Sequence, residues 1–175
     1  MTNFEDLIWL FNSNRKSRGM VRLNIAEGAM LYKYAKIKKD EVVVEIGRFN
    51  GGSAALIASV MDSGSVYSID IDTKSCEEKV SNNISSWRDK VVLINGDSKY
   101  VEWKNNIGLL FIDGDHTYEG VKADVDKYSP FVKKGGVIVF HDTDRDHING
   151  IVENLLDNGW RDIDAADTIR VICKL

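Results

Sequence analysis

Acidic and histidine side chains follow the apolar segments of this chain, where they could bind a ligand or move a proton. Five apolar runs are each followed closely by such side chains, namely Glu45, Asp70, Asp97, Asp113 with Asp115, and His141 with Asp142. In open α/β sheets, ligands bind outside the carboxyl ends of the strands, so the residues that end each run are the informative ones. Polar loops and helix caps also place acids at such positions. Because all five runs end in this way, we expect a ligand site rather than unrelated caps.

The first of these positions lies in a stretch, 41–60, that has the pattern of a strand, a glycine turn and a helix. β-branched residues lead into Glu45, the turn carries Gly47 and Gly51, and a helical pattern of small and apolar residues begins at Ser53. Backbone N–H groups and a helix N-terminus would face a ligand there. A Cβ at Gly47 or Gly51 would hold that ligand away from the backbone. An ordinary βα turn is the alternative.

Asp70 and Asp97 suit a nucleotide-like ligand. Asp70 ends the strand after the glycine turn, 23 residues beyond Gly47, where a carboxylate can accept hydrogen bonds from both hydroxyls of a ribose. A cap for the helix that starts near Ser75 is the alternative. Asp97 and Ser98 follow the third strand and could meet an adenine edge beside the same ligand, or they could form a simple turn.

A second set of acids follows the fourth and fifth strands, with no Arg or Lys in either motif. If these strands are neighbours, Asp113, Asp115 and Asp142 come together, and the repulsion would raise their pKa values unless a cation sat between them. Oxygen ligands of this kind suit Mg²⁺, Mn²⁺ or Ca²⁺, and adding His141 or His116 would favour Mn²⁺ or another transition metal. The alternative is a solvated acidic rim.

His116 is the best candidate for a catalytic base. It comes three residues after Asp113, on the loop that opens a helix, and a neutral imidazole can take a proton near pH 7. A metal ligand and a helix cap are the alternatives for His116. His147 has no comparable context, and we expect it at the surface.

Composition indicates a soluble globular protein. The 175 residues carry a net charge of -4, with 43% hydrophobic and 29% charged residues, which argues weakly against a nucleic-acid partner. The basic cluster Arg15–Arg18 is most simply a solvated segment, and contact with an anionic ligand is the alternative. Cys76 and Cys173 are far apart, which favours reduced thiols, although a disulfide is the alternative. Without a signal-peptide pattern or an apolar run of ~20 residues, we expect a cytoplasmic location and no membrane contact.

The rest of the pattern alternates helix and strand. Helices are predicted over 3–11, 24–37, 53–60, 75–87, 117–132 and 147–158, and strands over 42–44, 66–69, 91–94, 109–112, 137–140, 160–163 and 168–173. Five apolar strands separated by helices predict a mostly parallel sheet covered on both faces. The short link 164–167 predicts that the last two strands pair as a hairpin. We therefore expect one domain over 1–175, in which residues 1–23, or a neighbouring subunit of a homo-oligomer, could close the pocket.

Taken together, these residues resemble the class I S-adenosylmethionine-dependent methyltransferases, over about Asn24 to the end of the chain. The sequence EIGRFNGGS, which begins at Glu45, is similar to the E/D-x-G-x-x-x-G signature of that family and not to the G-x-G-x-x-G of most nicotinamide enzymes. The terminal hairpin is also similar to the methyltransferase sheet. The resemblance implies an α/β, Rossmann-like, seven-stranded sheet in the order 3-2-1-4-5-7-6, with one antiparallel strand and helices on both faces.

Within that class, Phe111–His116 and Val139–Asp142 resemble the divalent-metal-dependent small-molecule O-methyltransferases, of the catechol and antibiotic-sugar types. The resemblance implies two sets of site residues. The cofactor set is Glu45, Gly47, Gly51 and Ser53 at the methionine part, Asp70 at the ribose, and Asp97 with Ser98 near the adenine. The metal set is Asp113, Asp142 and His141, and His141 stands where those enzymes usually have another acid. His116 falls where the catechol type carries a lysine base.

The predicted function is methyl transfer from S-adenosylmethionine to a hydroxyl of a small molecule. A divalent metal, Mg²⁺ or Mn²⁺, would lower the pKa of the substrate hydroxyl, and His116 with Asp113 would serve catalysis. One alternative is a binding or scaffold protein that keeps this fold without turnover. The other is a nicotinamide-dependent oxidoreductase, although the spacing of Gly47 and Gly51 is unfavourable for it.

Overall fold

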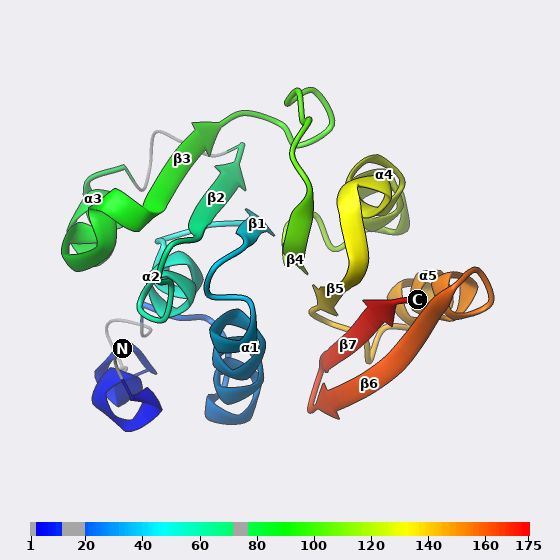
Figure 1. Cartoon of the computed structure of the whole chain (residues 1–175), viewed down its shortest axis with the longest axis horizontal. Coiled ribbons are helices and arrows are strands. Elements are labelled where there is room, and N and C mark those ends of the chain that lie inside the picture. The colour runs from blue at the N-terminus through cyan, green and yellow to red at the C-terminus, as the bar shows by residue number, and fades with distance from the viewer. Residues whose placement is uncertain (1–2, 12–19, 72–76) are drawn as a thin grey trace.

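The computed structural model describes residues 3–11, 20–71 and 77–175, which are built around one sheet of seven strands (Figure 1). The strands are β1 Val42–Ile46, β2 Ser65–Asp70, β3 Val91–Asn95, β4 Ile107–Ile112, β5 Val132–Phe140, β6 Trp160–Ala166 and β7 Ile169–Lys174. Their order across the sheet is β3-β2-β1-β4-β5-β7-β6. Neighbours from β3 to β5 are parallel, whereas β7 is antiparallel to both β5 and β6. The predicted sheet, its order and its terminal hairpin are confirmed.

The strand register aligns the ends of β1, β4 and β5. Ile46 pairs with Ile112, and Ile112 pairs with Phe140. The hydrogen bonds continue one residue further, since the backbone N–H of Asp113 donates to Ile46 (2.9 Å) and that of His141 donates to Ile112 (3.1 Å). The residues that follow three different strands are thereby placed side by side at one edge of the sheet.

Helices cover both faces of the sheet (Figure 1). The α-helices are α1 Ile25–Ile37, α2 Gly52–Ala58, α3 Glu77–Asn83, α4 Tyr118–Tyr128 and α5 Asp146–Leu156, and the 3-10 helices are η1 Phe4–Phe11, η2 Ser85–Lys90 and η3 Ser129–Phe131. Successive residues of a strand point to opposite faces. Val43 therefore packs in one apolar cluster with Leu56 of α2, and Val44 packs in the other with Val121 of α4. Helices η1, α1 and α2 contribute to the first cluster, and α4 and α5 to the second.

Two predicted helices differ from the structure. The predicted helix 75–87 is divided at Ile84 (φ −93°, ψ 3°) into α3 and η2, and Trp87 inside η2 has a non-helical backbone (φ −132°, ψ 24°). Residues 75 and 76 lie outside the described part. The predicted helix 117–132 was wrong in its last turn. Pro130 cannot continue an α-helix, so α4 ends at Tyr128 and a short 3-10 turn leads into β5. Lys133, Lys134 and Gly135, which follow the predicted helix in the sequence, lie inside β5, where Gly135 has φ +73°.

Residues 20–23 lead from the N-terminal region to the start of α1 and cross the first turn of α2. A Cβ built on Gly52 would overlap the carbonyl group of Met20. The backbone N–H of Val21 donates to the carbonyl of Leu10 in η1 (3.2 Å). This part of the predicted pocket cover therefore lies against the helix that follows the glycine turn, while the basic cluster 15–18 lies outside the described residues.

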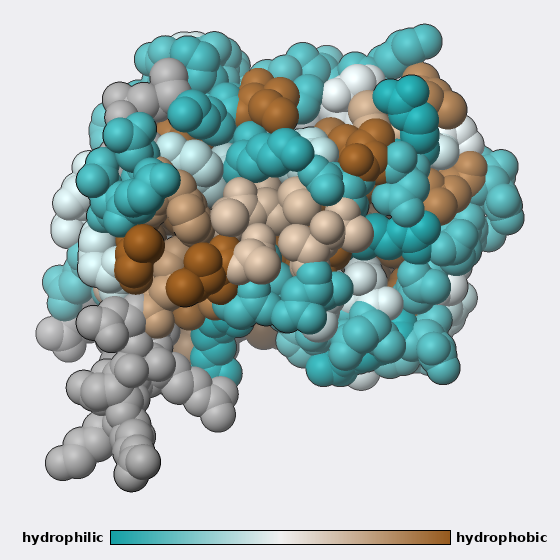
Figure 2. Space-filling view, turned by 90° about the horizontal axis from the view of Figure 1, so that it is seen from below, coloured by the Kyte–Doolittle hydropathy of each residue, from teal (hydrophilic) through white to brown (hydrophobic). Residues whose placement is uncertain are grey.

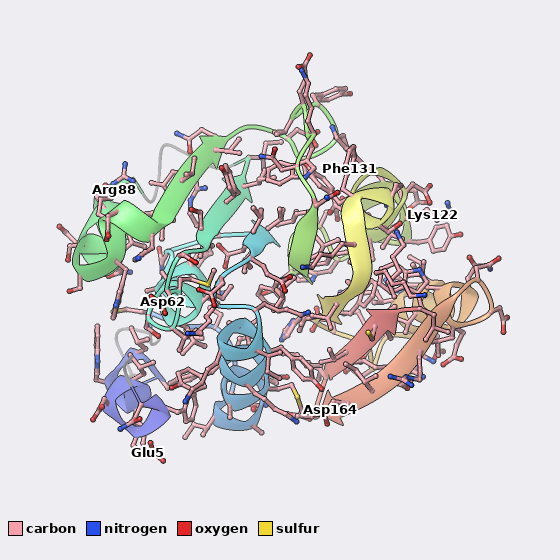
Figure 3. The ribbon with its side chains drawn as sticks, viewed as in Figure 1. Glu5, Asp62, Arg88, Lys122, Phe131 and Asp164 are labelled. Carbon is pink, nitrogen blue, oxygen red and sulfur yellow. The ribbon has the colours of Figure 1, made fainter. Side chains whose placement is uncertain are left out.

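Many of the charged side chains lie around the outside of the sheet and its helices, whereas Glu27, Glu45, Arg48 and Asp124 are buried. Figure 3 shows Glu5, Arg88 and Lys122 at the periphery, around side chains that fill the space between the elements. The face in Figure 2 is largely hydrophilic, with small separate hydrophobic areas. In the described part of the chain, the helices are too short or too polar to span a bilayer.

We predict that Gly47→Ala destabilises the fold far more than Gly135→Ala. Both glycines have positive φ, of 94° and 73°, but a Cβ on Gly47 would overlap the backbone of Asp113, whereas a Cβ on Gly135 meets nothing within 4 Å. Urea unfolding should show a loss of more than about 3 kcal/mol for Gly47→Ala and about 1–2 kcal/mol for Gly135→Ala. Equal losses would contradict the close approach at Gly47.

Candidate active site

A pocket of about 580 Å³ lies at the carboxyl ends of the strands. Its described lining residues include most of the predicted site, namely Gly47, Ser53, Asp70, Asp97, Ser98, Asp113, His116, His141 and Asp142. Glu45 and Gly51, which were also predicted to contact the cofactor, are not among them. Met20, Arg22 and Leu23 of the segment before α1 line the pocket as well. Residues from strand ends, the glycine turn and the N-terminal segment thus share one cavity.

Gly47 is required by the packing of the protein itself. Its backbone N–H donates to Ile69 (3.0 Å), and the missing Cβ makes room for the backbone of Asp113. A Cβ on residue 47 would therefore meet the backbone of the protein itself, and the expected contact of Gly47 with a ligand remains a prediction. The glycine brings the turn after β1 against the loop after β4, and both loops line the pocket.

Asp70 shapes the glycine turn from the end of β2. One of its carboxylate oxygens, Oδ2, accepts hydrogen bonds from the backbone N–H groups of Arg48 and Phe49, both at 2.8 Å. These bonds hold Phe49 in a left-handed conformation (φ 47°), which is unusual for a residue other than glycine. Arg22 lies over the Phe49 ring at 4.1 Å from its centroid. Asp70, which was predicted to bind the ribose, therefore stabilises the glycine turn, and the same hydrogen bonds hold its carboxylate in position.

Arg48 is buried behind the turn and joins three strands. Its guanidinium donates to the carbonyl of Ser68 in β2 (2.6 Å) and to the side chain of Asn95 at the end of β3 (2.7 Å). The sequence analysis did not assign Arg48 a role. An arginine next to a glycine turn looks exposed in a sequence, and only the tertiary structure shows that its side chain points inward.

Glu45 in β1 is fully buried, and its carboxylate interacts with other side chains of the protein interior. The Ser68 hydroxyl donates to its carboxylate. Burial raises the pKa of Glu45 to about 7, although hydrogen bonds from Ser53 and Ser68 and the charge of Arg48 oppose that shift. With this pKa, Glu45 titrates near neutral pH at its buried position in β1. Ser53 hydrogen-bonds to Glu45 and also lines the pocket.

Asp124 is a pocket residue that the sequence analysis missed. It lies on α4, is only 2% exposed, and accepts a hydrogen bond from the Ser98 hydroxyl (2.5 Å). Burial raises its pKa to about 6, which the Ser98 hydrogen bond and Lys99 partly oppose. A signal was present, because an acid within the buried stripe of α4 needs a polar partner. Asp124 and Ser98 together line the side of the pocket predicted for the adenine.

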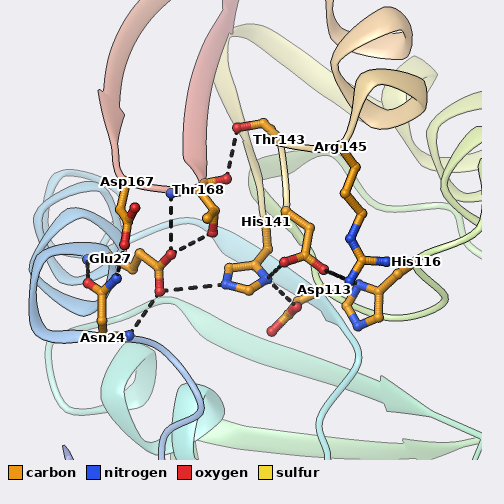
Figure 4. Close-up of polar contacts among 10 residues, drawn as sticks. Asn24, Glu27, Asp113, His116, His141, Thr143, Arg145, Asp167 and Thr168 are labelled. Carbon is orange, nitrogen blue, oxygen red and sulfur yellow. Dashed lines mark hydrogen bonds and ion pairs between the residues drawn. The ribbon is translucent and has the colours of Figure 1, made fainter.

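His141 lies among three carboxylates (Figure 4). Its Nδ1 is 3.0 Å from Asp113 Oδ1 and 3.3 Å from Asp142 Oδ1, and its Nε2 is 3.6 Å from Glu27 Oε2. Burial lowers the pKa of the imidazole, but Asp113, Asp142 and Glu27 outweigh that effect and raise the pKa to about 9. The raised pKa favours the protonated imidazole at neutral pH.

Asp142 connects this cluster to His116 (Figure 4). Asp142 Oδ2 is 2.9 Å from His116 Nδ1 and 3.0 Å from an amino nitrogen of Arg145. Asp142 adopts a left-handed backbone (φ 57°). His147, predicted as a surface residue, is exposed, but its Nε2 lies 2.9 Å from the carbonyl oxygen of His116 and so contacts the loop between β4 and α4.

The residues predicted to bind a divalent metal lie close together, and their side chains contact one another and other side chains of the protein. Within residues 3–11, 20–71 and 77–175, no group of three or more His, Cys, Asp or Glu side chains is arranged to hold a metal ion. The charged nitrogens of His141 and Arg145 occupy the space beside Asp113 and Asp142. The metal prediction is therefore not confirmed, and no step below uses it.

The fold and the site together define a class I S-adenosylmethionine-dependent methyltransferase. Residues 44–143 match the model of the family described as methyltransferase domain, and the chain belongs to that family. The pocket described above lies within the matched region for all but its N-terminal lining residues.

Two solved structures and one protein sequence illustrate the likeness. An O-methyltransferase from Bacillus cereus in complex with S-adenosylhomocysteine matches with a TM-score of 0.68 and 16% identity, over 98% of this chain and 90% of that one. An rRNA methylase from Streptococcus thermophilus matches with a TM-score of 0.66 and 16% identity, over 83% of this chain and 95% of that one. At these identities the likeness shows the fold alone. An uncharacterised protein of Acanthamoeba polyphaga mimivirus is 33% identical over 116 residues, 60% of this chain, and the chain matches only about half (52%) of that protein.

We predict that Glu45→Gln removes a pH dependence of stability between about pH 4.5 and pH 7. The folded pKa of Glu45, about 7, lies above its ordinary value of 4.5. As pH rises through this window the unfolded chain loses the proton first, so folding loses up to about 3 kcal/mol of stability. Urea unfolding of both proteins across this range measures the difference. Parallel stability curves for the wild type and the variant would contradict the assignment.

Proposed function

We propose that this chain transfers a methyl group from S-adenosylmethionine to a hydroxyl of a small molecule, with His116 as the base that accepts the hydroxyl proton. The observation that carries the proposal is the contact between His116 Nδ1 and Asp142 Oδ2, at 2.9 Å on the wall of the pocket. A carboxylate at Nδ1 fixes the tautomer of the ring and leaves Nε2 to accept a proton. Arg145 contacts the same carboxylate oxygen, Asp142 Oδ2, at 3.0 Å.

The pocket suits the cofactor in size and chemistry. Small-molecule sites usually have volumes of roughly 300–1,000 Å³, and this pocket lies within that range. Gly47 and Ser53 would lie beside the methionine part, Asp70 would bind the ribose hydroxyls, and Ser98 with Asp124 would face the adenine. The bound cofactor would supply an electrophilic methyl group on a positive sulfonium, which an acid-rich pocket accommodates. The complex of the structurally similar O-methyltransferase from Bacillus cereus with S-adenosylhomocysteine supports the choice of cofactor.

The acceptor would approach past the segment before α1. Met20 and Leu23 line the pocket with apolar surface, and Phe49 extends that surface from the glycine turn. Apolar walls exclude water from the reacting atoms and position a small acceptor, and most of the rate enhancement would come from such positioning and from electrostatics. His116 lies on the same wall as Asp113 and Asp142, where the hydroxyl would be deprotonated.

We predict that S-adenosylhomocysteine binds the wild-type protein and that Asp70→Asn weakens its affinity about tenfold or more, since an amide is a poorer acceptor for the ribose hydroxyls. Isothermal titration calorimetry measures both affinities. Asp62→Asn is the matched control, because Asp62 is an exposed acid away from the pocket. Absence of binding to the wild type would contradict the proposed cofactor.

We predict that His116→Gln lowers kcat about 10²–10⁴-fold while the affinity for S-adenosylhomocysteine stays within about threefold of the wild type. The assay follows labelled methyl transfer to a panel of catechol and sugar acceptors. His147→Gln is the control, because His147 contacts only the backbone of the same loop in the described structure. If the cofactor binds but no acceptor in the panel is methylated, the binding-protein alternative is favoured.

A further inference from the structure

The opening of the pocket carries exposed apolar side chains. Phe49 and Ile71 both line the pocket, and they are 42% and 71% exposed. Asp70 connects them, because its carboxylate accepts from the backbone N–H of Phe49 (2.8 Å) and Ile71 is the next residue in the chain. Single exposed apolar residues are common on protein surfaces. Two at the opening of one pocket offer an apolar surface to a small ligand.

Arg22 lies at the same opening. It lines the pocket, it is exposed, and its guanidinium carbon lies 4.1 Å from the centroid of the Phe49 ring. Its neighbours Val21 and Leu23 are buried in the apolar cluster on that face of the sheet. The backbone on both sides of Arg22 is therefore anchored, and the guanidinium is presented to the pocket by a segment that is fixed in the fold.

The N–H groups of Arg22 are available to a ligand. Stacking on Phe49 uses the face of the guanidinium, whereas its five N–H donors point outward in its plane. Within the part of the chain that the structure describes, the Arg22 side chain forms no hydrogen bond or ion pair. Asp70 and Asp124 of the pocket accept hydrogen bonds from the glycine turn and from Ser98 instead. A planar set of donors of this kind binds a carboxylate through two parallel hydrogen bonds.

We infer that the acceptor of this pocket is a hydroxylated organic acid, whose carboxylate binds Arg22 and whose apolar body packs on Phe49 and Ile71. That this ligand is methylated rests on the proposed function, whereas its binding does not. The assignment bears on the anionic contact that the sequence left open for the basic cluster 15–18. Those four residues lie outside the described part, but Arg22 follows them and lines the pocket.

The location of Arg22 suits the acceptor better than the cofactor. Asp124, which is assigned to the cofactor, is buried, whereas Arg22 and Phe49 are exposed at the opening. Several acids line the pocket and would repel an anionic acceptor, so its carboxylate requires a cation that is not already paired. Lys99 also lines the pocket, but its charge acts on Asp124 at the predicted adenine side.

The test compares protocatechuate with catechol, because the two compounds share a pair of hydroxyls and differ by one carboxylate. Isothermal titration calorimetry measures both affinities, with and without saturating S-adenosylhomocysteine. The wild type should bind protocatechuate about tenfold or more tightly than catechol, since charge-assisted hydrogen bonds to a carboxylate have a net effect of that order. Arg22→Gln should bind the two compounds with affinities within about threefold of each other. Equal affinities in the wild type, or binding of neither compound, would overturn the inference.

Two control variants separate the ionic contact from other effects. Lys99→Gln removes a positive charge from the pocket lining beside Ser98 and should keep the preference for protocatechuate. Ile71→Ser removes apolar surface without a change of charge, and it should weaken the binding of both compounds by a similar factor of about three. Loss of the preference in Lys99→Gln would show that the total charge of the pocket, and not Arg22, selects the acid. Unchanged affinity of Ile71→Ser for both compounds would contradict the apolar contact.

A further comparison distinguishes the carboxylate of the acceptor from that of the cofactor. Arg22→Gln should keep the urea midpoint of the wild type, because Arg22 is exposed, and should bind S-adenosylhomocysteine within about threefold of the wild type. Weaker binding of S-adenosylhomocysteine, with unchanged binding of methylthioadenosine, which lacks the amino-acid group, would assign Arg22 to the cofactor and overturn the inference. An Arg22-dependent preference for protocatechuate in a protein that transfers no methyl group would reject the proposed function and support the ligand assignment.

Discussion

The site depends on the backbone hydrogen bonds that continue past the ends of three strands. Gly47 donates to Ile69, Asp113 donates to Ile46, and His141 donates to Ile112. This extension places three loop residues in one row, although they are far apart in the chain. It is possible only because residue 47 has no side chain where the backbone of Asp113 passes. The glycine turn, the acid after β4 and the histidine after β5 therefore depend on one close approach.

Around that row, the protein alternates negative and positive side chains. Arg48 fills the space beneath the turn, His141 separates Asp113 from Asp142, and Arg145 lies against Asp142 on its far side. Buried charges are unfavourable unless each has a partner. The paired arrangement lets several acids lie close to the pocket. Their positions are set by the protein, and reorganisation during a reaction would be small.

Much of the fold and part of the site could be predicted from the sequence. Apolar runs such as Leu109–Ile112 gave the strands, and the residues that end such runs gave most of the pocket lining, because parallel strands finish at the same edge. The strand order came from the family resemblance. The end of α4 was misplaced, since a helical pattern continues past Pro130 in sequence but not in backbone geometry.

The missed residues share a physical cause. Glu27, Arg48 and Asp124 are buried charged side chains, and burial of a charge depends on which elements pack against it. The structure shows that Glu27 forms a capping box with Asn24 and that its carboxylate also reaches Thr168 and His141, contacts that were not predicted from the sequence. For the same reason the sequence showed that the acids near His141 come together, but not the distances of 3.0 and 3.3 Å between Nδ1 and the two aspartates.

The left-handed backbone of Asp142 affects how an aspartate at this position should be interpreted in related sequences. At φ 57°, Asp, Asn and Gly are the residues that a chain tolerates readily. Selection for a foldable loop would therefore retain a small polar residue here even in a descendant that had lost its chemistry. An aspartate at this position in a relative is weak evidence of catalysis when it stands alone. The informative pattern is Asp142 together with partners that the loop conformation does not demand, His116 and Arg145.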